Sequence, residues 1–322
     1  MMNILVTGAN GQLGQCLRDL VETNDTENKW LWTDVSTIEG RNCDYLDITD
    51  AESVKKYFVD NAISICVNCA AYTNVDKAEE DRERAKRLNA DAPKNLAEAC
   101  NIHNSKLIHI STDYVFNGTS FIPLTEDRAT LPTSIYGMSK LVGEENIINS
   151  GCKYLIFRTA WLYSEYGNNF VKTMIKLIKE KDRINVVNDQ IGTPTYARDL
   201  AKLIFNIITN NGLWYYDGNR PLEKNGIYHF TNEGVCSWYD FAQYIRFVLC
   251  DCCNYDTAKL AVINGIPTKE YYKDNDKPHA RRPHYSVLSK EKTKSDFITL
   301  FTPEWWGVNV ESCVKNIESK VG

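Results

Sequence analysis

The stretch NILVTGANGQLG (residues 3–14) decides the fold of this chain. It opens with an apolar run typical of a buried strand, continues into a glycine-rich turn, and passes directly into residues with helical spacing of leucine. Gly8, Gly11 and Gly14 fall in the pattern G-x-x-G-x-x-G. A helix that begins at such a turn presents free backbone N–H groups, which bind the pyrophosphate of a dinucleotide. The alternative is a tight strand-to-helix turn that holds no ligand.

A carboxylate ends the next expected strand, KWLWTD (residues 29–34). Asp34 follows Gly14 at the spacing where an acid bonds the adenosine ribose of a bound dinucleotide. The same carboxylate repels a 2′-phosphate, so Asp34 favours NADH over NADPH. Arg41 is the residue that could still support NADPH. The cofactor expected from these residues is therefore NADH or NADPH.

Strand and helix patterns alternate through the first half of the chain. Strands are predicted at residues 3–8, 29–34, 63–71, 106–111 and 154–159, and helices at 12–21, 51–60, 85–100 and 134–148. This alternation predicts a parallel sheet wrapped by helices with right-handed crossovers, a doubly wound α/β fold of the Rossmann type.

The second half of the chain is less regular. Helices are predicted at residues 168–181, 196–209 and 237–250, and strands at 184–189 and 226–231, and the tail ends in VESCVKNIESK (residues 310–320). We therefore predict a dinucleotide-binding domain over residues 1–165. Residues 166–322 are expected to form mostly a smaller α/β substrate-binding lobe, with some segments returning to the first domain.

Composition excludes several classes of protein. The chain has 322 residues, of which 43% are apolar and 25% charged, and a net charge of −5. Such a balance is ordinary for a globular protein and gives no reason to expect nucleic acid or a membrane surface as partner. No apolar run approaches the roughly 20 residues that cross a bilayer, and the N-terminal residues do not resemble a signal peptide, so a cytoplasmic protein is expected. The eleven cysteines lack the spacing of a zinc site, so we predict free thiols and no metal.

The stretch KLIHISTDYVF (residues 106–116) ends an expected strand in consecutive oxygen-bearing side chains. Thr112 and Asp113 could simply cap a turn, since such residues satisfy free backbone N–H groups. In open α/β folds, however, ligands bind at the carboxyl ends of the strands. These two side chains are therefore candidates for a catalytic and substrate-binding role.

Tyr136 and Lys140, in YGMSK, complete the candidate catalytic set. Their spacing places both side chains on one face of the expected helix, one turn apart. A free tyrosine has a pKa near 10 and is a poor acid or base at neutral pH. An ammonium about 5 Å away would lower that pKa by roughly two units at an effective dielectric of about 20. Tyr136 is thus predicted to donate a proton to a carbonyl oxygen that Thr112 also binds.

These residues resemble the extended short-chain dehydrogenase/reductase family, and within it the dTDP-4-dehydrorhamnose reductases. The resemblance covers nearly the whole chain and rests on VTGANGQLG, VNCAAYTNVDKAE, STDYVF, YGMSK, FRTAWLY, NNFVKTM, NDQIGTPTYARDLA and RRPHYSVL. It implies NAD(P)H-dependent reduction of the C4 ketone of dTDP-4-dehydro-β-L-rhamnose, a dTDP-linked 4-keto-6-deoxysugar, to dTDP-L-rhamnose. Polysaccharide biosynthesis is the setting that this reaction implies.

The resemblance also implies further positions in the site. Cofactor contacts are expected from the pyrophosphate residues Gly11, Gln12 and Leu13, from Asp47 and Ile48 near the adenine, and from Ala70, Ala71 and Tyr72 near the nicotinamide ribose. Lys140 would hold that ribose and Asp113 would reach a sugar hydroxyl. Substrate contacts are expected from Trp161, Asn169 and Arg282. Core packing is the alternative for Trp161, and a solvated charge is the alternative for Arg282, whose fork would otherwise match diphosphate oxygens.

Two departures from the family pattern affect partners. Some relatives bind Mg2+ between subunits through a glutamate near the C-terminus, at the place where this chain has Trp306, so no such ion is predicted and a homodimer is left open. The segment GIPTKEYYKDNDKPHARRP (residues 265–283) is longer than expected, which puts the nearby substrate loop in doubt.

Three other functions remain as alternatives. A nucleotide-sugar 4,6-dehydratase needs an acid after the strand-end aspartate, where this chain has Tyr114. A reductase of another nucleotide 4-keto-6-deoxysugar would share all the residues above. Regulatory subunits of methionine adenosyltransferase resemble the family and bind a dinucleotide without turnover, but the intact Thr112, Tyr136 and Lys140 argue against a non-catalytic role.

Overall fold

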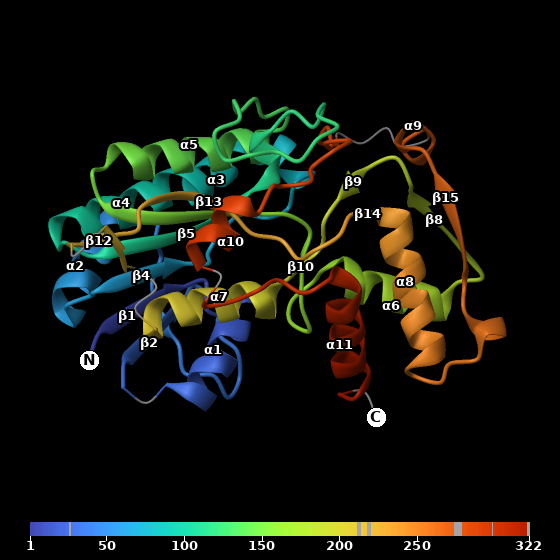
Figure 1. Cartoon of the computed structure of the whole chain (residues 1–322), viewed down its shortest axis with the longest axis horizontal. Helices are drawn as coiled ribbons and strands as arrows, with labels where there is room; N and C mark the ends of the chain where they lie inside the picture. Colours follow the sequence, from blue (N-terminus) through green and yellow to red (C-terminus); the bar gives the residue numbers. More distant parts are fainter. Residues whose placement is uncertain (26, 211–213, 218–219, 274–278, 298, 321–322) are drawn as a thin grey trace.

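A seven-stranded parallel sheet forms the centre of the computed structural model, which describes residues 1–25, 27–210, 214–217, 220–273, 279–297 and 299–320 (Figure 1). The strand order is β13-β6-β5-β4-β1-β2-β3, and every neighbouring pair is parallel. The strands are β1 (Asn3–Thr7), β2 (Lys29–Asp34), β3 (Asp44–Tyr45), β4 (Ile65–Asn68), β5 (Lys106–Thr112), β6 (Lys153–Thr159) and β13 (Gly226–His229). The predicted fold class is confirmed.

The order of the strands reverses between β1 and β4. After β1 the chain adds β2 and β3 on one side, and then crosses back to add β4, β5 and β6 on the other. Ligands of doubly wound sheets bind outside the carboxyl ends of the strands at such a switch point. The turn that follows β1 and the loop that follows β4 therefore meet where a dinucleotide is expected.

Helices cover both faces of the sheet (Figure 1). On one face α1 (Gln12–Asn24) and α7 (Ala197–Thr209) bury leucines and isoleucines against Ile4 and Val6 of β1. On the other face α2 (Ala51–Asn61) and α4 (Ala92–Ile102) pack with Leu5, and α5 (Ile135–Asn149) lies beside α4. Alternate residues of β1 thus enter opposite cores, as the period of a strand requires.

The helix predicted over residues 85–100 is interrupted in the structure. It consists of α3 (Arg82–Lys86), a π-helical turn η2 (Arg87–Asp91) and α4. Within the π turn, Asn89 accepts a hydrogen bond from the Tyr72 N–H (2.9 Å) and donates to the Tyr72 carbonyl (3.0 Å) and the Ser139 hydroxyl (3.0 Å). These long-range bonds explain the interruption, because they draw the Asn89 side chain toward the site rather than along a regular helix.

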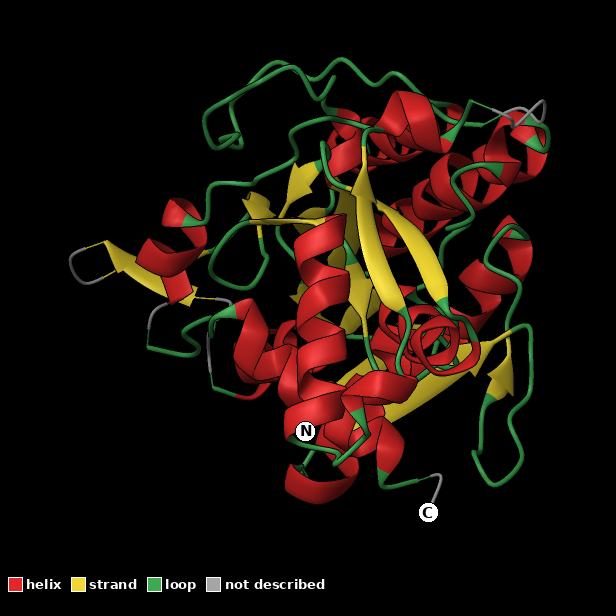
Figure 2. Ribbon diagram, turned by 90° about the vertical axis from the view of Figure 1, so that its right-hand side faces the viewer, coloured by secondary structure: helices red, strands yellow, loops and turns green. Residues whose placement is uncertain are grey.

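A second lobe is built mainly from later segments, and Figure 2 shows it from the side. Its core is enclosed by α6 (Phe170–Glu180), α8 (Trp238–Asp251) and α11 (Trp306–Glu318), together with the parallel pair β8 (Arg183–Val187) and β15 (Val262–Ile266). Two later elements belong to the first part of the fold instead, because β13 joins the main sheet and α7 packs beside α1. A domain boundary at residue 165 stays a prediction.

Short elements complete the described chain. Besides β3, the two-residue strands are β7 (Leu162–Tyr163), β9 (Ile191–Gly192), β10 (Thr195–Tyr196) and β14 (Cys236–Ser237), and a hairpin pairs β11 (Trp214–Asp217) with β12 (Arg220–Glu223). The remaining helices are η1 (Lys77–Glu79), η3 (Asp113–Val115), η4 (Thr257–Lys259), α9 (Thr268–Tyr271) and α10 (Glu291–Phe297). All eleven cysteines are free thiols, as predicted.

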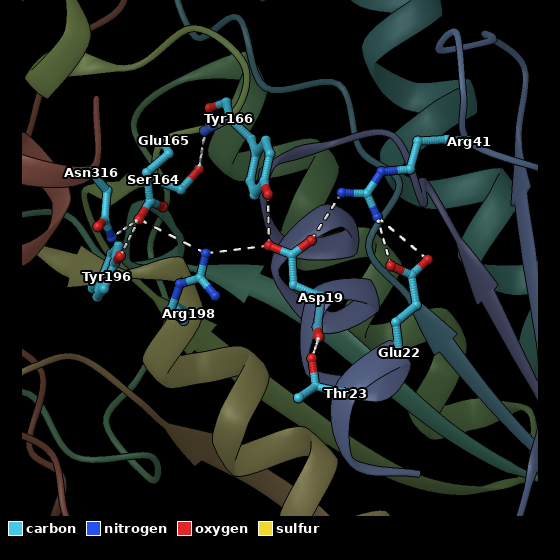
Figure 3. Close-up of polar contacts among 10 residues, drawn as sticks. All are labelled: Asp19, Glu22, Thr23, Arg41, Ser164, Glu165, Tyr166, Tyr196, Arg198 and Asn316. Atoms are coloured by element: carbon cyan, nitrogen blue, oxygen red, sulfur yellow. Dashed lines mark hydrogen bonds and ion pairs between the residues drawn. The ribbon is translucent and has the colours of Figure 1, made fainter. Parts of the chain in front are cut away.

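A polar network joins the two lobes on the α1 side of the sheet (Figure 3). Asp19 of α1 accepts a hydrogen bond from the Tyr166 hydroxyl (2.6 Å) and pairs with Arg198 of α7 (3.2 Å). Arg198 also approaches the buried Glu165 (3.8 Å), which accepts from Asn316 of α11 (2.7 Å). This network fixes α1, and with it the glycine turn at its start, to the elements that carry the second lobe.

Candidate active site

The glycine turn is built so closely that two of its glycines cannot be replaced. Gly8 has φ +65°, and a Cβ there would lie 2.5 Å from the Ala70 nitrogen. A Cβ on Gly14 would lie 2.5 Å from the Gly8 carbonyl oxygen. By contrast, Gly11 meets only one atom, at 3.2 Å, and begins α1 without a side-chain cap among the described residues. The free N–H groups of this helix start suit a pyrophosphate, so these residues fit a dinucleotide.

Asp34 lies beside the glycine turn, as the sequence predicts. One carboxylate oxygen accepts from the Asn10 N–H (3.1 Å), and the other accepts from the N–H (2.9 Å) and hydroxyl (2.8 Å) of Ser36. Arg41, in contrast, pairs with Asp19 (2.9 Å) and Glu22 (3.2 Å) of α1. The guanidinium of Arg41 is thus engaged by α1, and Asp34 is the ionic group placed at the turn.

Replacing Asp34 by alanine is expected to lower the ratio of kcat/KM with NADH to kcat/KM with NADPH by about tenfold, the value of one charge-assisted hydrogen bond. The physical reason is the loss of an acceptor for the ribose together with the loss of repulsion toward a 2′-phosphate. Ser36→Ala is the matched control, because it removes one donor to Asp34 and keeps the carboxylate. If Asp34→Ala leaves the ratio unchanged, the selectivity resides in another residue.

The other predicted cofactor residues line the same edge in different ways. Asp47 accepts from the N–H (2.9 Å) and hydroxyl (2.8 Å) of Thr49, and Ile48 is buried. Leu13 is buried in the core beneath α1, so only its backbone is available to a phosphate. The loop of Ala70, Ala71 and Tyr72 follows β4 and is held by Asn89. Contacts of these residues with a cofactor stay predictions.

Three of the predicted catalytic residues come together at the carboxyl end of β5. Tyr136 lies in the first turn of α5, which Ser134 caps by accepting from the Gly137 N–H (3.1 Å). The Tyr136 phenol lies close enough to the Thr112 hydroxyl for Thr112 to influence its pKa. That hydroxyl donates to Asp113 (3.0 Å), so the three side chains form one continuous polar chain.

Burial is the largest influence on the pKa values of Tyr136 and Asp113. It raises the pKa of Tyr136, with added repulsion from Asp113, while the neighbouring Thr112 hydroxyl works in the other direction. Burial also raises the pKa of Asp113 to about 6, although its hydrogen bond with Thr112 works in the other direction. A raised pKa keeps the Tyr136 phenol protonated at neutral pH. The phenol is therefore in the form that donates a proton.

Lys140 lies differently from the prediction. Its amine nitrogen donates to the Ile110 carbonyl (2.6 Å) and approaches the Nε2 of His109 (3.3 Å). Burial lowers the pKa of Lys140 to about 8, against the opposing charge of Glu144. Lys140 is not among the groups that set the pKa of Tyr136 in the structure. The predicted lowering of the tyrosine pKa is therefore not met in this arrangement, because the amine is turned toward β5.

Replacing Asp113 by asparagine is expected to stabilise the protein at neutral pH. The folded chain holds the Asp113 proton more tightly than the unfolded chain does, because its pKa is raised from 3.8 to about 6. Ionisation therefore costs stability as the pH rises from about 4 through 6, and the cost is complete above that range. Two pKa units correspond to about 3 kcal/mol. Urea unfolding should show this gain for Asp113→Asn at about pH 7.5 and none at about pH 4; an equal gain at both would contradict it.

Trp161 has a strained backbone at the boundary between the lobes. Its φ is +49°, a value that costs a non-glycine residue free energy and that persists where surrounding structure enforces it. Its ring stacks on Trp238 at 3.6 Å between centroids, and a Cβ on Gly192 would lie 2.7 Å from it. These contacts of Trp161 are packing contacts, as its core-packing alternative expects. A substrate contact stays a prediction.

Asn169 uses its whole side chain in protein contacts. The oxygen accepts from the Lys172 N–H (3.1 Å) and caps α6, while the amide nitrogen donates to the Ser164 carbonyl (2.7 Å) and to Gln12 (3.0 Å). Gln12 belongs to the start of α1, so Asn169 connects the second lobe to the glycine turn. The structure thus gives Asn169 a positioning role, and its contact with a nucleotide sugar stays a prediction.

Arg282 contacts Tyr114, which packs against Tyr136. Its guanidinium pairs with Asp76 (2.5 Å) and donates to the hydroxyls of Tyr114 (3.2 Å) and Tyr272 (2.9 Å). Tyr114 in turn packs edge-to-face on Tyr136 at 5.5 Å between ring centroids. Arg282 is therefore paired rather than solvated. Within the long segment around it, residues 274–278 lie outside the described part of the chain.

Four buried polar residues of the site have no role assigned to them from the sequence. His109 lies next to Lys140 and Asn68 lies on the other side of the His109 ring, while Glu144 and Arg158 pair beneath Ser111. Polar residues inside otherwise apolar strands are the signal that could have indicated Asn68, His109 and Arg158, since buried polar groups require partners. Their partners lie on other strands and helices, so one sequence does not reveal them.

The described ranges of the chain hold neither a metal-binding cluster nor a membrane-spanning helix. No group of three or more histidine, cysteine, aspartate or glutamate side chains there could hold a metal ion, and no helix there is long and apolar enough to cross a membrane. Trp306 is buried and packs edge-to-face on Phe241 (5.8 Å) and Tyr244 (5.1 Å).

A Rossmann-type sheet with a glycine turn at its switch point and a tyrosine–lysine pair beside it defines an NAD(P)-dependent oxidoreductase. The family model of the RmlD substrate binding domain matches residues 2–319. The dTDP-4-dehydrorhamnose reductase of Aggregatibacter actinomycetemcomitans is 38% identical over 304 residues, which cover 92% of this chain and 94% of that protein. The chain belongs to the RmlD family, the family of dTDP-4-dehydrorhamnose reductases.

Two further relatives bear on substrate and cofactor. A probable dTDP-4,6-dihydroxy-2-methyloxan-3-one 4-ketoreductase of Streptomyces antibioticus is 38% identical over 293 residues, covering 90% of this chain and 88% of that protein. The solved structure of dTDP-4-dehydrorhamnose reductase from Bacillus anthracis in complex with NADP is 35% identical, with a TM-score of 0.81 over 98% of this chain and 99% of that one. The family therefore includes reductases of more than one ketosugar.

Proposed function

We propose that this protein reduces the C4 ketone of dTDP-4-dehydro-β-L-rhamnose to dTDP-L-rhamnose with NADH or NADPH. The observation that carries the proposal is the polar chain of Tyr136, Thr112 and Asp113 at the carboxyl end of β5. It lies on the strand edge that the glycine turn after β1 also occupies, and two relatives named for this reaction or a related one share 38% identity with the chain.

In the proposed mechanism, the protein side chains supply a proton and hydrogen bonds to the ketone oxygen. When bound, the reduced dinucleotide supplies the hydride. Tyr136 delivers its proton to the ketone oxygen, a role that suits a phenol whose raised pKa keeps it protonated. Thr112 hydrogen-bonds the same oxygen and fixes its position. In the free protein the one proton of the Thr112 hydroxyl is donated to Asp113 (3.0 Å), so Thr112 exchanges this bond for the ketone oxygen when the substrate binds.

Two basic residues complete the proposed site. Lys140 would bind the hydroxyls of the nicotinamide ribose after leaving the Ile110 carbonyl. Arg282 would bind the diphosphate of the nucleotide sugar, for which its planar fork is suited. To do so the guanidinium has to exchange its pairing with Asp76, so the diphosphate competes with a carboxylate for the same donors.

The function is tested by following the absorbance of the reduced cofactor with three ketosugars. The expected substrate is dTDP-4-dehydro-β-L-rhamnose, made in the cuvette by the corresponding epimerase, and the comparison compounds carry UDP or GDP. We expect cofactor oxidation with the dTDP sugar and a kcat/KM at least about tenfold lower with the others, the loss of one or two base contacts. Equal rates with all three would place recognition outside the base.

The Streptomyces relative supports a second candidate, a 4-ketoreductase of another dTDP-linked deoxysugar. The same assay separates the two. Turnover of the rhamnose precursor at a low rate, together with fast turnover of a dTDP-linked 4-ketosugar of different configuration, would favour the second candidate. Absence of cofactor oxidation with every ketosugar, despite dinucleotide binding, would favour a regulatory subunit.

A further inference from the structure

A buried chain of hydrogen bonds ends on the amine of Lys140. The Ala70 N–H donates to the oxygen of Asn68 (3.1 Å), and the Asn68 amide nitrogen lies 3.1 Å from the Nδ1 of His109. The Nε2 of His109 lies 3.3 Å from the Lys140 amine, which donates to the Ile110 carbonyl (2.6 Å). Asn68, His109 and Lys140 are all at most 2% exposed. No step of the proposed mechanism uses His109.

The direction of these bonds follows from the backbone. A peptide N–H can only donate, so Ala70 requires the oxygen of Asn68 to face it, and the Thr7 hydroxyl donates to the same oxygen (2.8 Å). The Asn68 amide N–H group therefore faces Nδ1 of His109, which must accept and carries no proton. A neutral ring then has its proton on Nε2, the atom that faces Lys140.

A ring N–H that faces an ammonium group brings two donors together. An ammonium has no lone pair, whereas an uncharged amine accepts one hydrogen bond and still donates to the Ile110 carbonyl. If the Asn68 amide were flipped, its NH2 group would face the Ala70 N–H, and two donors would again face each other. Protonating the ring fully is opposed by burial and by Lys140, which hold the pKa of His109 well below its usual range. An uncharged Lys140 is the state in which every group of the chain has a partner.

The other charged groups around the amine do not restore an ammonium. Glu144, one turn further along α5, raises the pKa of Lys140, but its carboxylate is shared by Arg158 (2.6 Å) and Ser111. Tyr136 on the same helix stays neutral because its pKa is raised. Asp113, at the end of β5, is bonded to Thr112. Burial remains the largest influence, and it lowers the pKa of Lys140 to about 8 before the facing N–H is considered.

We propose that the Asn68–His109 pair is a positioning device that holds Lys140 as an uncharged amine against β5, so that binding of the dinucleotide takes up a proton from solvent. The inference rests on the proposed function only for the role of Lys140 at the cofactor ribose. The amine leaves the His109 N–H and the Ile110 carbonyl, forms one new N–H bond with a proton from solvent and becomes an ammonium, and no other covalent bond changes. His109 is thereby a positioning residue, and Lys140 acquires its charge only when the cofactor is present.

The first test uses the protein without cofactor, so it is independent of the proposed function. Nitrogen-15 NMR of labelled histidine should show His109 with its proton on Nε2, and carbon-13 NMR of the lysine ε-carbon should show Lys140 titrating below about pH 8, since burial and the facing N–H act together. Asn68→Asp is nearly isosteric, and its carboxylate accepts a hydrogen bond from an Nδ1–H group, so the ring carries its proton on Nδ1 and Nε2 becomes an acceptor. The Lys140 midpoint should then rise by at least about one pH unit.

The second test measures proton uptake on binding NADH, which has no 2′-phosphate that could itself titrate. Calorimetry near pH 8 in buffers of different ionisation enthalpy should show uptake by the wild type and reduced uptake by Asn68→Asp and His109→Leu. His229→Leu is the matched control, because His229 is also fully buried and bonds the Leu124 carbonyl instead (3.1 Å). It should take up the proton as the wild type does.

Three results would overturn the inference. They are a His109 proton on Nδ1, a Lys140 midpoint near that of a free lysine, and NADH binding by the wild type without proton uptake. A protein that shows the expected tautomer and midpoint but binds no dinucleotide would instead contradict the proposed function. The two failures are therefore distinguishable.

Discussion

Tyr136→Phe is expected to lower kcat for ketone reduction by about 10²-fold or more, in line with loss of a general acid. The variant keeps the ring, its edge-to-face contact with Tyr114 (5.5 Å) and its place in the first turn of α5. Only the hydroxyl that lies in the polar chain with Thr112 is removed. The dissociation constant for NADH, measured by quenching of its fluorescence, should therefore stay within about twofold of wild type, because no cofactor charge contact is lost.

The chain offers a matched control for this variant. Tyr163 is fully buried, and its hydroxyl has no hydrogen-bond partner among the described residues, so Tyr163→Phe removes the same atom from a tyrosine outside the site. Its kcat should equal that of the wild type. Turnover by Tyr136→Phe at the rate of the control would show that another group donates the proton.

Arg158→Met is expected to lower the free energy of unfolding by about 3–5 kcal/mol, the usual result when one partner of a buried pair is removed. Arg158 of β6 and Glu144 of α5 are 3% and 1% exposed, and the guanidinium bonds both carboxylate oxygens (3.0 and 2.6 Å). Without Arg158 the Glu144 carboxylate would be buried without its cation. The measurement is urea unfolding of the variant and wild type at neutral pH.

Two further variants show whether the lost stability comes from the broken ion pair or from the loss of a long side chain. Arg158→Met combined with Glu144→Gln removes both charges and should recover most of the lost stability. Lys56→Met breaks the exposed pair with Asp60 on α2 (76% and 52% exposed) and should change stability by less than about 0.5 kcal/mol. If Arg158→Met lowers the free energy of unfolding no more than Lys56→Met does, the buried pair of Arg158 and Glu144 does not stabilise the protein.

Local patterns were sufficient for the parts of the fold that depend on neighbouring residues. The glycine turn, the strand that carries Thr112 and the helix that carries Tyr136 all formed where their periodicity and capping residues predicted them. Their convergence also followed, because the carboxyl ends of parallel strands meet at one edge of the sheet. The class of site was therefore predictable from the sequence.

The parts that sequence reasoning missed depend on contacts between distant segments. The π turn around Asn89 exists because its side chain bonds Tyr72 and Ser139, and Asn169 faces Gln12 across the two lobes. The direction of the Lys140 amine was predicted from helical spacing alone, which places the residue on a face but does not say that His109 lies beneath it. A single sequence contains no information on such pairings until the fold is known.

Isotope transfer tests the central claim most directly. The protein is incubated with dTDP-4-dehydro-β-L-rhamnose and with reduced cofactor that carries deuterium at the transferable position, and the sugar product is analysed by NMR and mass spectrometry. The account predicts one deuterium per product molecule, located at C4, and a negligible yield of that product with Tyr136→Phe. Product without deuterium at C4, or labelled product formed equally well by the variant, would contradict it.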